Sequence, residues 1–127
     1  MPTTLQGPPV APPRTELWRV TDRRTFRALR ERGRRARRAA ITVTWLPPSP
    51  GDEDTPPRVA FAVNRGAGGA VLRNRIRRRL RAALRELRAS GRLPAGTYLV
   101  GGQAELAHLP WSTLVERLDA TCAEARS

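Results

Sequence analysis

The chain has 127 residues and a formal net charge of +13, which comes from 24 arginines, 11 acidic residues and no lysine. That length allows one domain with a modest core, and the charge is typical of a protein that meets a polyanion. The single cysteine, Cys122, excludes an internal disulfide and a cysteine-based zinc cluster. No apolar run is long enough to span a membrane, and the N-terminus does not resemble a signal peptide, so we expect a cytoplasmic protein without a membrane partner.

The positive charge is concentrated in the first two thirds of the chain. Residues 14–92 carry 22 arginines and 7 acidic residues, whereas residues 93–127 carry 2 arginines and 4 acidic residues. The polyanion is therefore expected to meet the first part. The exclusive use of arginine suits bidentate phosphate binding and stacking on bases, and it is equally expected from the base composition of a genome.

The chain is predicted to begin with a tail and a short helix. Residues 1–15 are rich in proline, threonine and glycine, which predicts a disordered tail ahead of one domain over residues 16–125. The first helix of that domain should be capped by Thr21 or Asp22 and stop at Gly33.

Two strands are predicted in the middle of the chain. Residues 41–45 alternate between large apolar side chains and threonine, which indicates a half-buried strand. The basic cluster that precedes this strand, Arg34 to Arg38, is most simply predicted to be an exposed turn. The proline-rich residues 46–57 are expected to form a hairpin connection to a second strand over residues 58–64.

A glycine turn and an arginine-rich helix follow the second strand. Gly66, Gly68 and Gly69 break the strand, and they either present backbone amides to a phosphate or form a plain turn. From about Val71 the apolar residues recur three or four apart, which predicts an amphipathic helix. Arginines cover its opposite side, and Glu86 is its only acidic residue. So uniform a charge predicts a surface that faces a nucleic acid rather than a solvated face.

The remaining elements complete the fold class. Arg73 should lie close to the apolar stripe of the arginine-rich helix, where its guanidinium needs a fixed partner or a way past the neighbouring element. A short strand is predicted over residues 97–100, and the apolar spacing after Pro110 predicts a last helix. The order helix, strands, helix, strand, helix indicates an α+β domain built on one small sheet.

Groups able to carry catalysis are few. His108, the only histidine, is most simply a surface or capping residue, and Cys122 is most simply part of the core. The acidic residues 52–54 have the chemistry to hold magnesium, but among prolines they are more simply a solvated loop. We therefore expect no catalytic residue and no metal ligand in this chain. An arginine-coated helix suits a folded RNA better than base readout in duplex DNA.

One stretch resembles the signature of a known family. The sequence Gly68-Gly69-Ala70-Val71-Leu72-Arg73-Asn74-Arg75-Ile76-Arg77-Arg78 is similar to the signature of the bacterial ribonuclease P protein subunit. The predicted first helix, with Phe26 at an aromatic position, and the strand over residues 58–65 resemble the same family. The resemblance covers about residues 17–123 in the same element order.

The resemblance implies a function and a fold. Ribonuclease P is an RNA-based endonuclease that removes the 5′ leader from precursor tRNA, and its catalytic RNA subunit carries the chemistry with bound magnesium. The protein would be a cofactor that binds this RNA and the leader, strengthens substrate and magnesium binding, and is not catalytic alone. Its implied partners are the catalytic RNA and precursor tRNA, with no obligate protein partner. The implied fold is an α/β sandwich whose arginine-rich helix lies in a left-handed βαβ crossover.

The resemblance also assigns residues to the two RNAs. Phe26, Arg30 and Thr44 would line the leader-binding cleft, and because the family often has aromatic residues at the last two positions, base stacking would be weaker or replaced by arginine and charge. Gly66 stands where the family usually has a basic residue, and Trp45 should point to the other face of its strand. The residues implied to face the catalytic RNA are Arg65, Arg73, Asn74, Arg75, Arg77, Arg78 and Arg81.

Two other classes of protein remain alternatives. A different RNA-binding or ribosome-associated protein would bind other structured RNAs and would not prefer precursor over mature tRNA. A DNA-binding regulator would show sequence preference on duplex DNA, which an almost all-arginine face should lack.

Overall fold

A five-stranded mixed sheet, with strand order β1-β4-β5-β3-β2, organises the protein. The computed structural model describes residues 15–127, so the tail expected over residues 1–15 lies almost wholly outside the described residues. The elements in chain order are β1 (Trp18–Arg19), α1 (Arg23–Arg32), β2 (Arg34–Arg38), β3 (Ile41–Leu46), β4 (Arg58–Ala62), the 3₁₀ turn η1 (Arg65–Ala67), α2 (Ala70–Ala89), β5 (Thr97–Gly102), the 3₁₀ turn η2 (Ala104–Ala107) and α3 (Trp111–Arg126).

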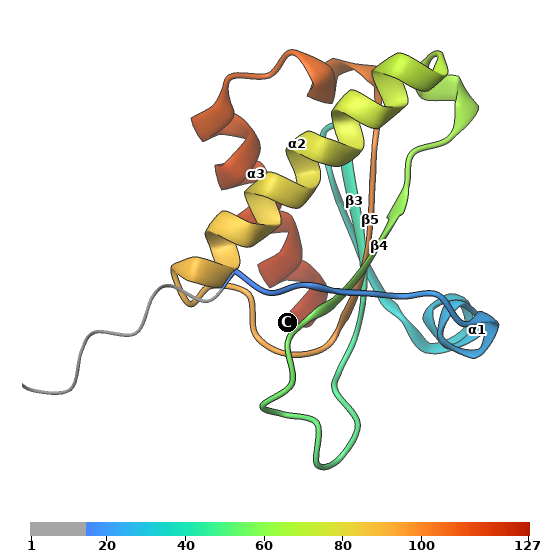
Figure 1. Ribbon diagram of the computed structural model, residues 1–127, viewed down its shortest axis with the longest axis vertical. Helices are drawn as coiled ribbons and strands as arrows, with labels where there is room; N and C mark the ends of the chain where they lie inside the picture. The colour runs from blue at the N-terminus through green and yellow to red at the C-terminus, as the bar shows by residue number, and fades with distance from the viewer. Residues whose placement is uncertain (1–14) are drawn as a thin grey trace, which may run out of the picture.

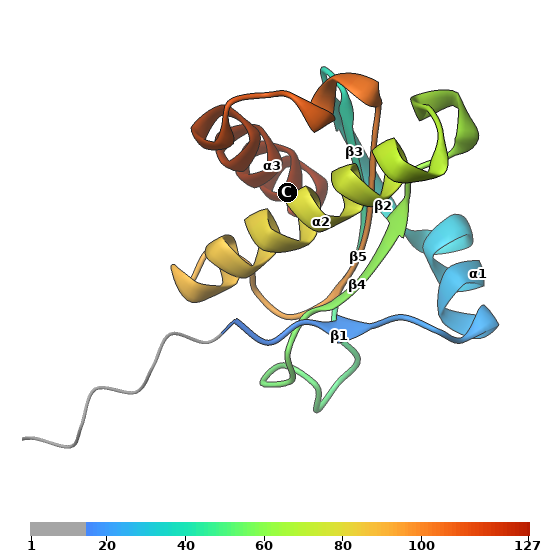
Figure 2. The same ribbon diagram turned by 45° about the horizontal axis from the view of Figure 1, so that its top comes forward.

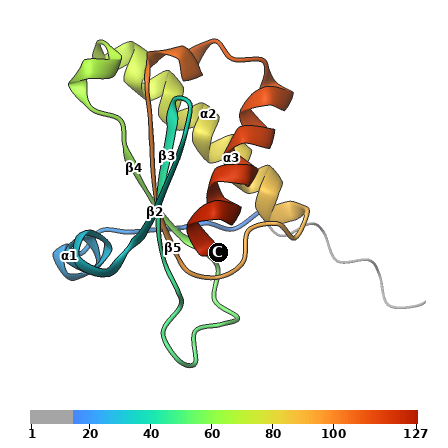
Figure 3. The same ribbon diagram turned by 180° about the vertical axis from the view of Figure 1, so that it is seen from behind.

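Helices cover the two faces of the sheet unequally. α2 and α3 pack together on one face, and α1 lies on the other (Figures 1 and 3). The predicted apolar stripe of α2 is confirmed, because Ile76, Leu80 and Leu84 are completely buried. Leu114 and Leu118 of α3 complete this core. The face that carries only α1 is left partly open.

The arginine-rich helix connects two neighbouring parallel strands. β4 pairs with β5 in parallel, and α2 joins the end of β4 to the start of β5. In Figure 2, α2 passes in front of the two strands, with β4 to the right of β5 at the level of the helix. Since both strands run upward in this view, the crossover is left-handed, as the family resemblance implied. This hand is rare for such a connection.

The first helix has the predicted bounds. The Asp22 carboxylate accepts a hydrogen bond from the Thr25 amide at 2.9 Å, and hydrogen bonds from Thr25 lower the pKa of this carboxyl. At the other end the Gly33 amide donates to the Leu29 carbonyl at 2.9 Å. Both ends of α1 are therefore fixed by the residues that the sequence indicated.

Two predictions about the segments around β3 are wrong. The basic cluster Arg34–Arg38 is the edge strand β2 rather than an exposed turn, and it pairs antiparallel with β3 through the short turn at Ala39 and Ala40. Ala36 is the one buried residue of β2, so the strand has too little apolar alternation to be recognised from sequence. The proline-rich loop of residues 46–57 does not close a hairpin, because β5 lies between β3 and β4.

Three further features refine the sequence analysis. Trp45 is half-buried against the core, on the face expected for it. The two-residue strand β1, which pairs in parallel with β4, was not predicted. The same is true of η2, whose Leu106 and Ala107 are fully buried beyond the end of β5. Within residues 15–127, no helix is long and apolar enough to cross a membrane.

Gly33 tests how closely α1 approaches the sheet. A Cβ atom at this position would lie 2.3 Å from the Leu29 carbonyl oxygen and 2.4 Å from Cγ2 of Thr44. We expect Gly33→Ala to lower the free energy of unfolding by about 1–3 kcal/mol, as overpacking does. Gly69→Ala is the control, because nothing lies within 4 Å of its Cβ position, and it should cost less than about 1 kcal/mol. Urea unfolding measures both variants, and equal losses would contradict a close contact at Gly33.

Candidate nucleic-acid interface

The arginines of α2 point in three directions because its apolar stripe is buried. Arg78 and Arg85 lie on the crest of the helix and are exposed. Arg77 and Arg81 lie on the flank that faces β4, and Arg79 lies on the flank that faces η2 and α3. The sequence predicted that arginines lie on the side of α2 opposite its apolar stripe. It did not predict which arginines face β4 and which face η2 and α3.

The flank that faces β4 borders a groove, which we call the arginine groove. It has a volume of about 420 Å³ and runs along the edge of β4 that β1 leaves free. A second hollow on the same side shares three of its arginines and extends to Asn74 and Arg78 on the crest. The residues that line the arginine groove are Leu17, Arg19, Val20, Phe26, Val59, Ala60, Phe61, Arg77, Arg81 and Arg85.

Two arginines of this groove are held in place by neighbouring groups. The Arg81 guanidinium lies 5.3 Å from the centre of the Phe61 ring, a cation–π geometry. Arg77 donates to the Asn74 side-chain oxygen at 2.8 Å and to the Val63 carbonyl at 3.4 Å. The groove therefore presents fixed positive charge beside aromatic surface, which suits an unpaired nucleic-acid strand.

The opposite flank of α2 serves the fold. Arg79 donates from both terminal nitrogens, to the carbonyls of Leu106 and Leu109, and its guanidinium lies 5.9 Å from the centre of the Trp111 ring. Arg75, predicted to face RNA, donates from Nε to the Ala107 carbonyl at 3.1 Å. These two arginines fasten η2 and the residues that follow it to α2, and because Arg75 is exposed its role in binding RNA stays a prediction. This role of Arg79 was not predicted, although the position of Arg79 at the margin of the apolar stripe indicates a side chain close to the neighbouring elements.

The N-terminal end of α2 carries the remaining predicted residues. Arg65 is exposed in η1, whose first amides are capped by the Asn64 side chain, which accepts from Gly66 at 3.0 Å. Arg73 is half-buried as expected from its position, and its Nε is buried without a hydrogen-bond partner among the described residues. Gly68 has a φ of 137°, and this backbone angle explains the glycine at that position.

The three predicted cleft residues do not lie together. Phe26, with 36% of its surface exposed, lines the arginine groove beside Arg77 and Arg81. Arg30 is exposed on the outer side of α1. Thr44 is 5% exposed and lies in a different hollow, close to where α1 ends at Gly33. Their role in leader binding stays a prediction.

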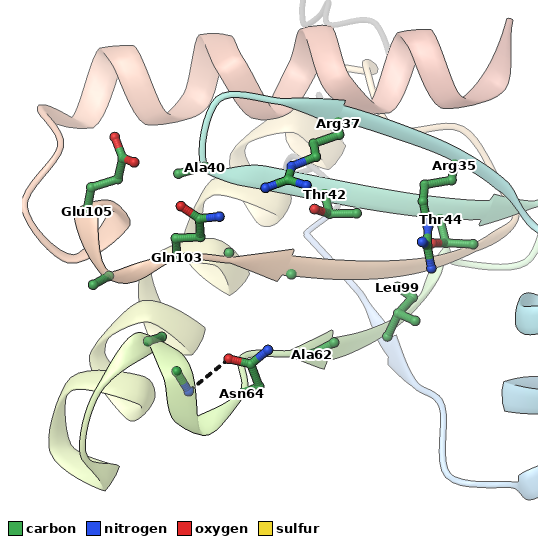
Figure 4. Close-up of a pocket in the computed structure, with 15 residues that line it drawn as sticks. Arg35, Arg37, Ala40, Thr42, Thr44, Ala62, Asn64, Leu99, Gln103 and Glu105 are labelled. Carbon is green, nitrogen blue, oxygen red and sulfur yellow. Dashed lines mark hydrogen bonds between the residues drawn. The ribbon is translucent and has the colours of Figure 1, made fainter.

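The hollow that contains Thr44, which we call the sheet-face hollow, has a volume of about 660 Å³ and lies on the open face of the sheet (Figure 4). Arg35 and Arg37 of β2 point into it beside Thr44 and Thr42, their partners on β3. Gln103 lines it from the end of β5. No aromatic residue lines this hollow, and Glu105 also lines it, so its chemistry is that of guanidinium, hydroxyl, amide and carboxylate groups. Arg35 and Arg37 were not among the residues predicted from the sequence to bind RNA, although their two-residue spacing around Ala36 places them on one face of a strand.

The groups considered for catalysis lie apart from both hollows. Cys122 is completely buried, and burial raises the pKa of its thiol to about 12. His108 is exposed at the end of η2. Glu53 accepts hydrogen bonds from the Gly51 amide within its own loop. Within the described part of the chain, no three histidine, cysteine or acidic side chains gather as metal ligands would.

The fold, the arginine-covered helix and the groove beside it define a class: an arginine-rich α+β protein whose basic surface is of the kind that suits nucleic acid. Comparison with known proteins makes the class specific. The family model described as Ribonuclease P matches residues 15–126. The chain belongs to this family, whose members are the protein component of the enzyme that matures the 5′ end of tRNA and partner an RNA subunit.

Individual relatives agree with the family model. The ribonuclease P protein component of Thermobifida fusca is 43% identical over 113 residues, which cover 84% of this chain and 73% of the relative. The component of a Nocardioides species is 44% identical over 82 residues, which cover 65% of this chain and 68% of the relative.

Solved structures share the fold. The ribonuclease P protein of Staphylococcus aureus superposes with a TM-score of 0.70 at 18% identity, covering 86% of this chain and 95% of that one. The protein of Thermotoga maritima superposes with a TM-score of 0.67 at 23% identity, covering 83% and 96%. The α+β fold expected from the sequence is therefore confirmed.

Arg78 provides a direct test of the crest as an RNA-binding surface. It is exposed, and no described residue forms a salt bridge with it. If it neutralises one phosphate, Arg78→Gln should flatten the plot of log affinity for the RNA subunit against log salt by about 0.7–0.9. Arg92→Gln is the control, since Arg92 is exposed but pairs with Asp119. Filter binding across a salt series measures the slope, and a slope equal to that of the unaltered protein would place Arg78 in solvent.

Proposed function

We propose that this protein binds the catalytic RNA of ribonuclease P through the crest of α2, and the 5′ leader of precursor tRNA through the arginine groove. The observation that carries the proposal is that Phe26 of α1 and the α2 arginines line one groove. A strand in that groove would lie beside the surface that meets the catalytic RNA. The protein would thereby hold the leader next to the RNA that cleaves it.

The crest of α2 supports binding to a folded RNA. It is a continuous ridge of exposed polar and basic side chains, with Asn74, Arg78 and Arg85 among them. Guanidinium groups on a convex helix reach phosphates without needing to read base edges. RNA helices are recognised mainly by shape and backbone, so this surface suits a structured RNA.

The arginine groove supports binding to a single strand. Phe26 offers a partly exposed ring on which an unpaired base can stack, while Arg19, Arg77 and Arg81 surround it with positive charge. Such a combination binds single strands with little dependence on sequence. The leader is the part of the precursor that mature tRNA lacks, so contacts here would favour the precursor.

In the proposed function, magnesium is bound mainly by the RNA subunit. The described residues offer no group of three acidic, histidine or cysteine side chains as a site, so the ions would be held mainly by the RNA subunit. Arginines that neutralise phosphates release the counterions that otherwise gather there. Fewer magnesium ions would then be needed to bring the leader and the catalytic RNA together.

The proposed function is tested by cleavage of a precursor tRNA with a bacterial ribonuclease P RNA at low magnesium, with and without this protein. We expect the protein to restore removal of the 5′ leader and to be inactive alone. If it binds the RNA but does not restore cleavage, the protein is a general RNA-binding module. Sequence-selective binding to duplex DNA in a parallel assay would support a regulator instead.

Phe26 tests the leader site separately. Replacing the ring in Phe26→Leu keeps an apolar side chain and removes base stacking, which is worth about 1–3 kcal/mol per base. We expect binding of precursor tRNA to weaken by an amount in this range, while binding of mature tRNA is unchanged. Trp111→Leu is the control, because Trp111 is 40% exposed but lies on the α3 side of α2. Equal losses for precursor and mature tRNA would mark Phe26 as a structural residue.

A further inference from the structure

The outer side of α1 carries a row of three arginines, of which the family resemblance assigned only Arg30 to the leader and the arginine groove contains none. Arg23, Arg27 and Arg30 follow one another at four and three residues, so at 100° per residue they project in nearly the same direction. All three are exposed. We call this row the α1 stripe.

The first two arginines of the α1 stripe do not favour their own helix. Like charges three and four residues apart repel each other, and Arg23 in the first turn opposes the helix dipole, whereas Arg30 in the last turn favours it. No acidic residue lies in that first turn, and neither salt bridge of the described residues involves α1. An arrangement that disfavours the free helix is expected where a bound polyanion compensates for it.

The position of α1 limits which polyanion reaches the stripe. α1 lies on the opposite face of the sheet from α2 (Figures 1 and 3), so the α1 stripe and the crest of α2 are separate surfaces. Phe26 projects from α1 on the flank next to Arg30 and lines the arginine groove. A strand that leaves the groove past Phe26 therefore arrives at the α1 stripe.

We propose that the α1 stripe binds phosphates of single-stranded RNA, namely the part of the 5′ leader upstream of the nucleotides held in the arginine groove. The inference rests on the proposed function, because it assumes that the leader occupies the groove. From Arg23 to Arg30 the stripe extends about 10 Å along the helix axis, which is enough to contact more than one phosphate. It binds the backbone and not the bases, so it favours long leaders over short ones whatever their sequence.

The test compares precursor tRNAs with leaders of about 3 and about 18 nucleotides, which bracket the usual range of about 4–16 nucleotides for single-strand binding sites. The variant is the double substitution Arg23→Gln and Arg27→Gln. We expect affinity for the long-leader precursor to fall by about three- to tenfold, with a salt slope flatter by about 1.4 for two lost phosphate contacts. Affinity for the short-leader precursor and for the catalytic RNA should be unchanged.

A matched control lies on the same helix. Arg24 and Arg32 face the proline-rich loop rather than the stripe, and they border a separate hollow there. The double substitution Arg24→Gln and Arg32→Gln removes the same charge from α1 and should leave the preference for the long leader intact. Neither pair of substitutions removes a buried side chain, so both variants should stay folded, with melting temperatures close to that of the unaltered protein.

Several results would overturn the inference. They are an equal loss for long and short leaders, an equal loss from the control pair, or no loss from the stripe variant. These results differ from a failure of the proposed function, in which the unaltered protein itself would not prefer precursor over mature tRNA or restore cleavage at low magnesium.

Discussion

The burial of one face of α2 is the constraint on which the rest of the structure depends. Ile76, Leu80 and Leu84 are fully enclosed between the sheet and α3, and each such side chain contributes about 1.5–3 kcal/mol on burial. Repulsion between exposed like charges on a helix costs only a few tenths of a kcal/mol per pair. The apolar face therefore outweighs the repulsion, and the helix can carry arginines on every other side. Fixing the stripe also fixes the direction in which each arginine points.

Because the arginines of α2 point in different directions, they make different contacts. Arg78 on the crest is free to meet an RNA, and Arg81 is held over Phe61 at the border of the arginine groove. Arg79 turns inward and satisfies two carbonyls at once, those of Leu106 and Leu109. The planar fork of arginine suits this arrangement because its two terminal nitrogens reach two separate carbonyls in a fixed geometry, whereas a lysine ammonium offers its donors from one nitrogen on a flexible stem. At this position the use of arginine has a structural cause, whatever the base composition of the gene.

Strong local signals in the sequence were enough to predict α1, α2, β4 and β5 to within a few residues. Caps at Asp22 and Gly33 and the period of the apolar residues are properties of the chain itself. β2 was not predicted, because Ala36 is its one buried residue and its strand geometry is set by pairing with β3. The site divides in the same way. A helical wheel predicts on which side of α2 each arginine lies. That Phe26 lines the arginine groove with these arginines, and that Thr44 does not, depends on how α1 packs on the sheet.

The arginine surfaces of α2 and α1 face opposite sides of the sheet and approach each other at the edge of β4, where Phe26 and the α2 arginines line the arginine groove. α2 and α1 lie on opposite faces of the sheet (Figure 1), so their outer arginines are separated by the layers of side chains and backbone between them. Exposed charges separated by more than about 8–10 Å are largely screened at physiological salt. A phosphate bound at the crest of α2 therefore interacts mainly with the arginines of that helix, and a phosphate at α1 with those of α1. Sites that share no partner contribute nearly additively. A thin basic domain can then hold two RNA segments on its two sides, each compensated by its own arginines, without requiring a change of shape to couple them.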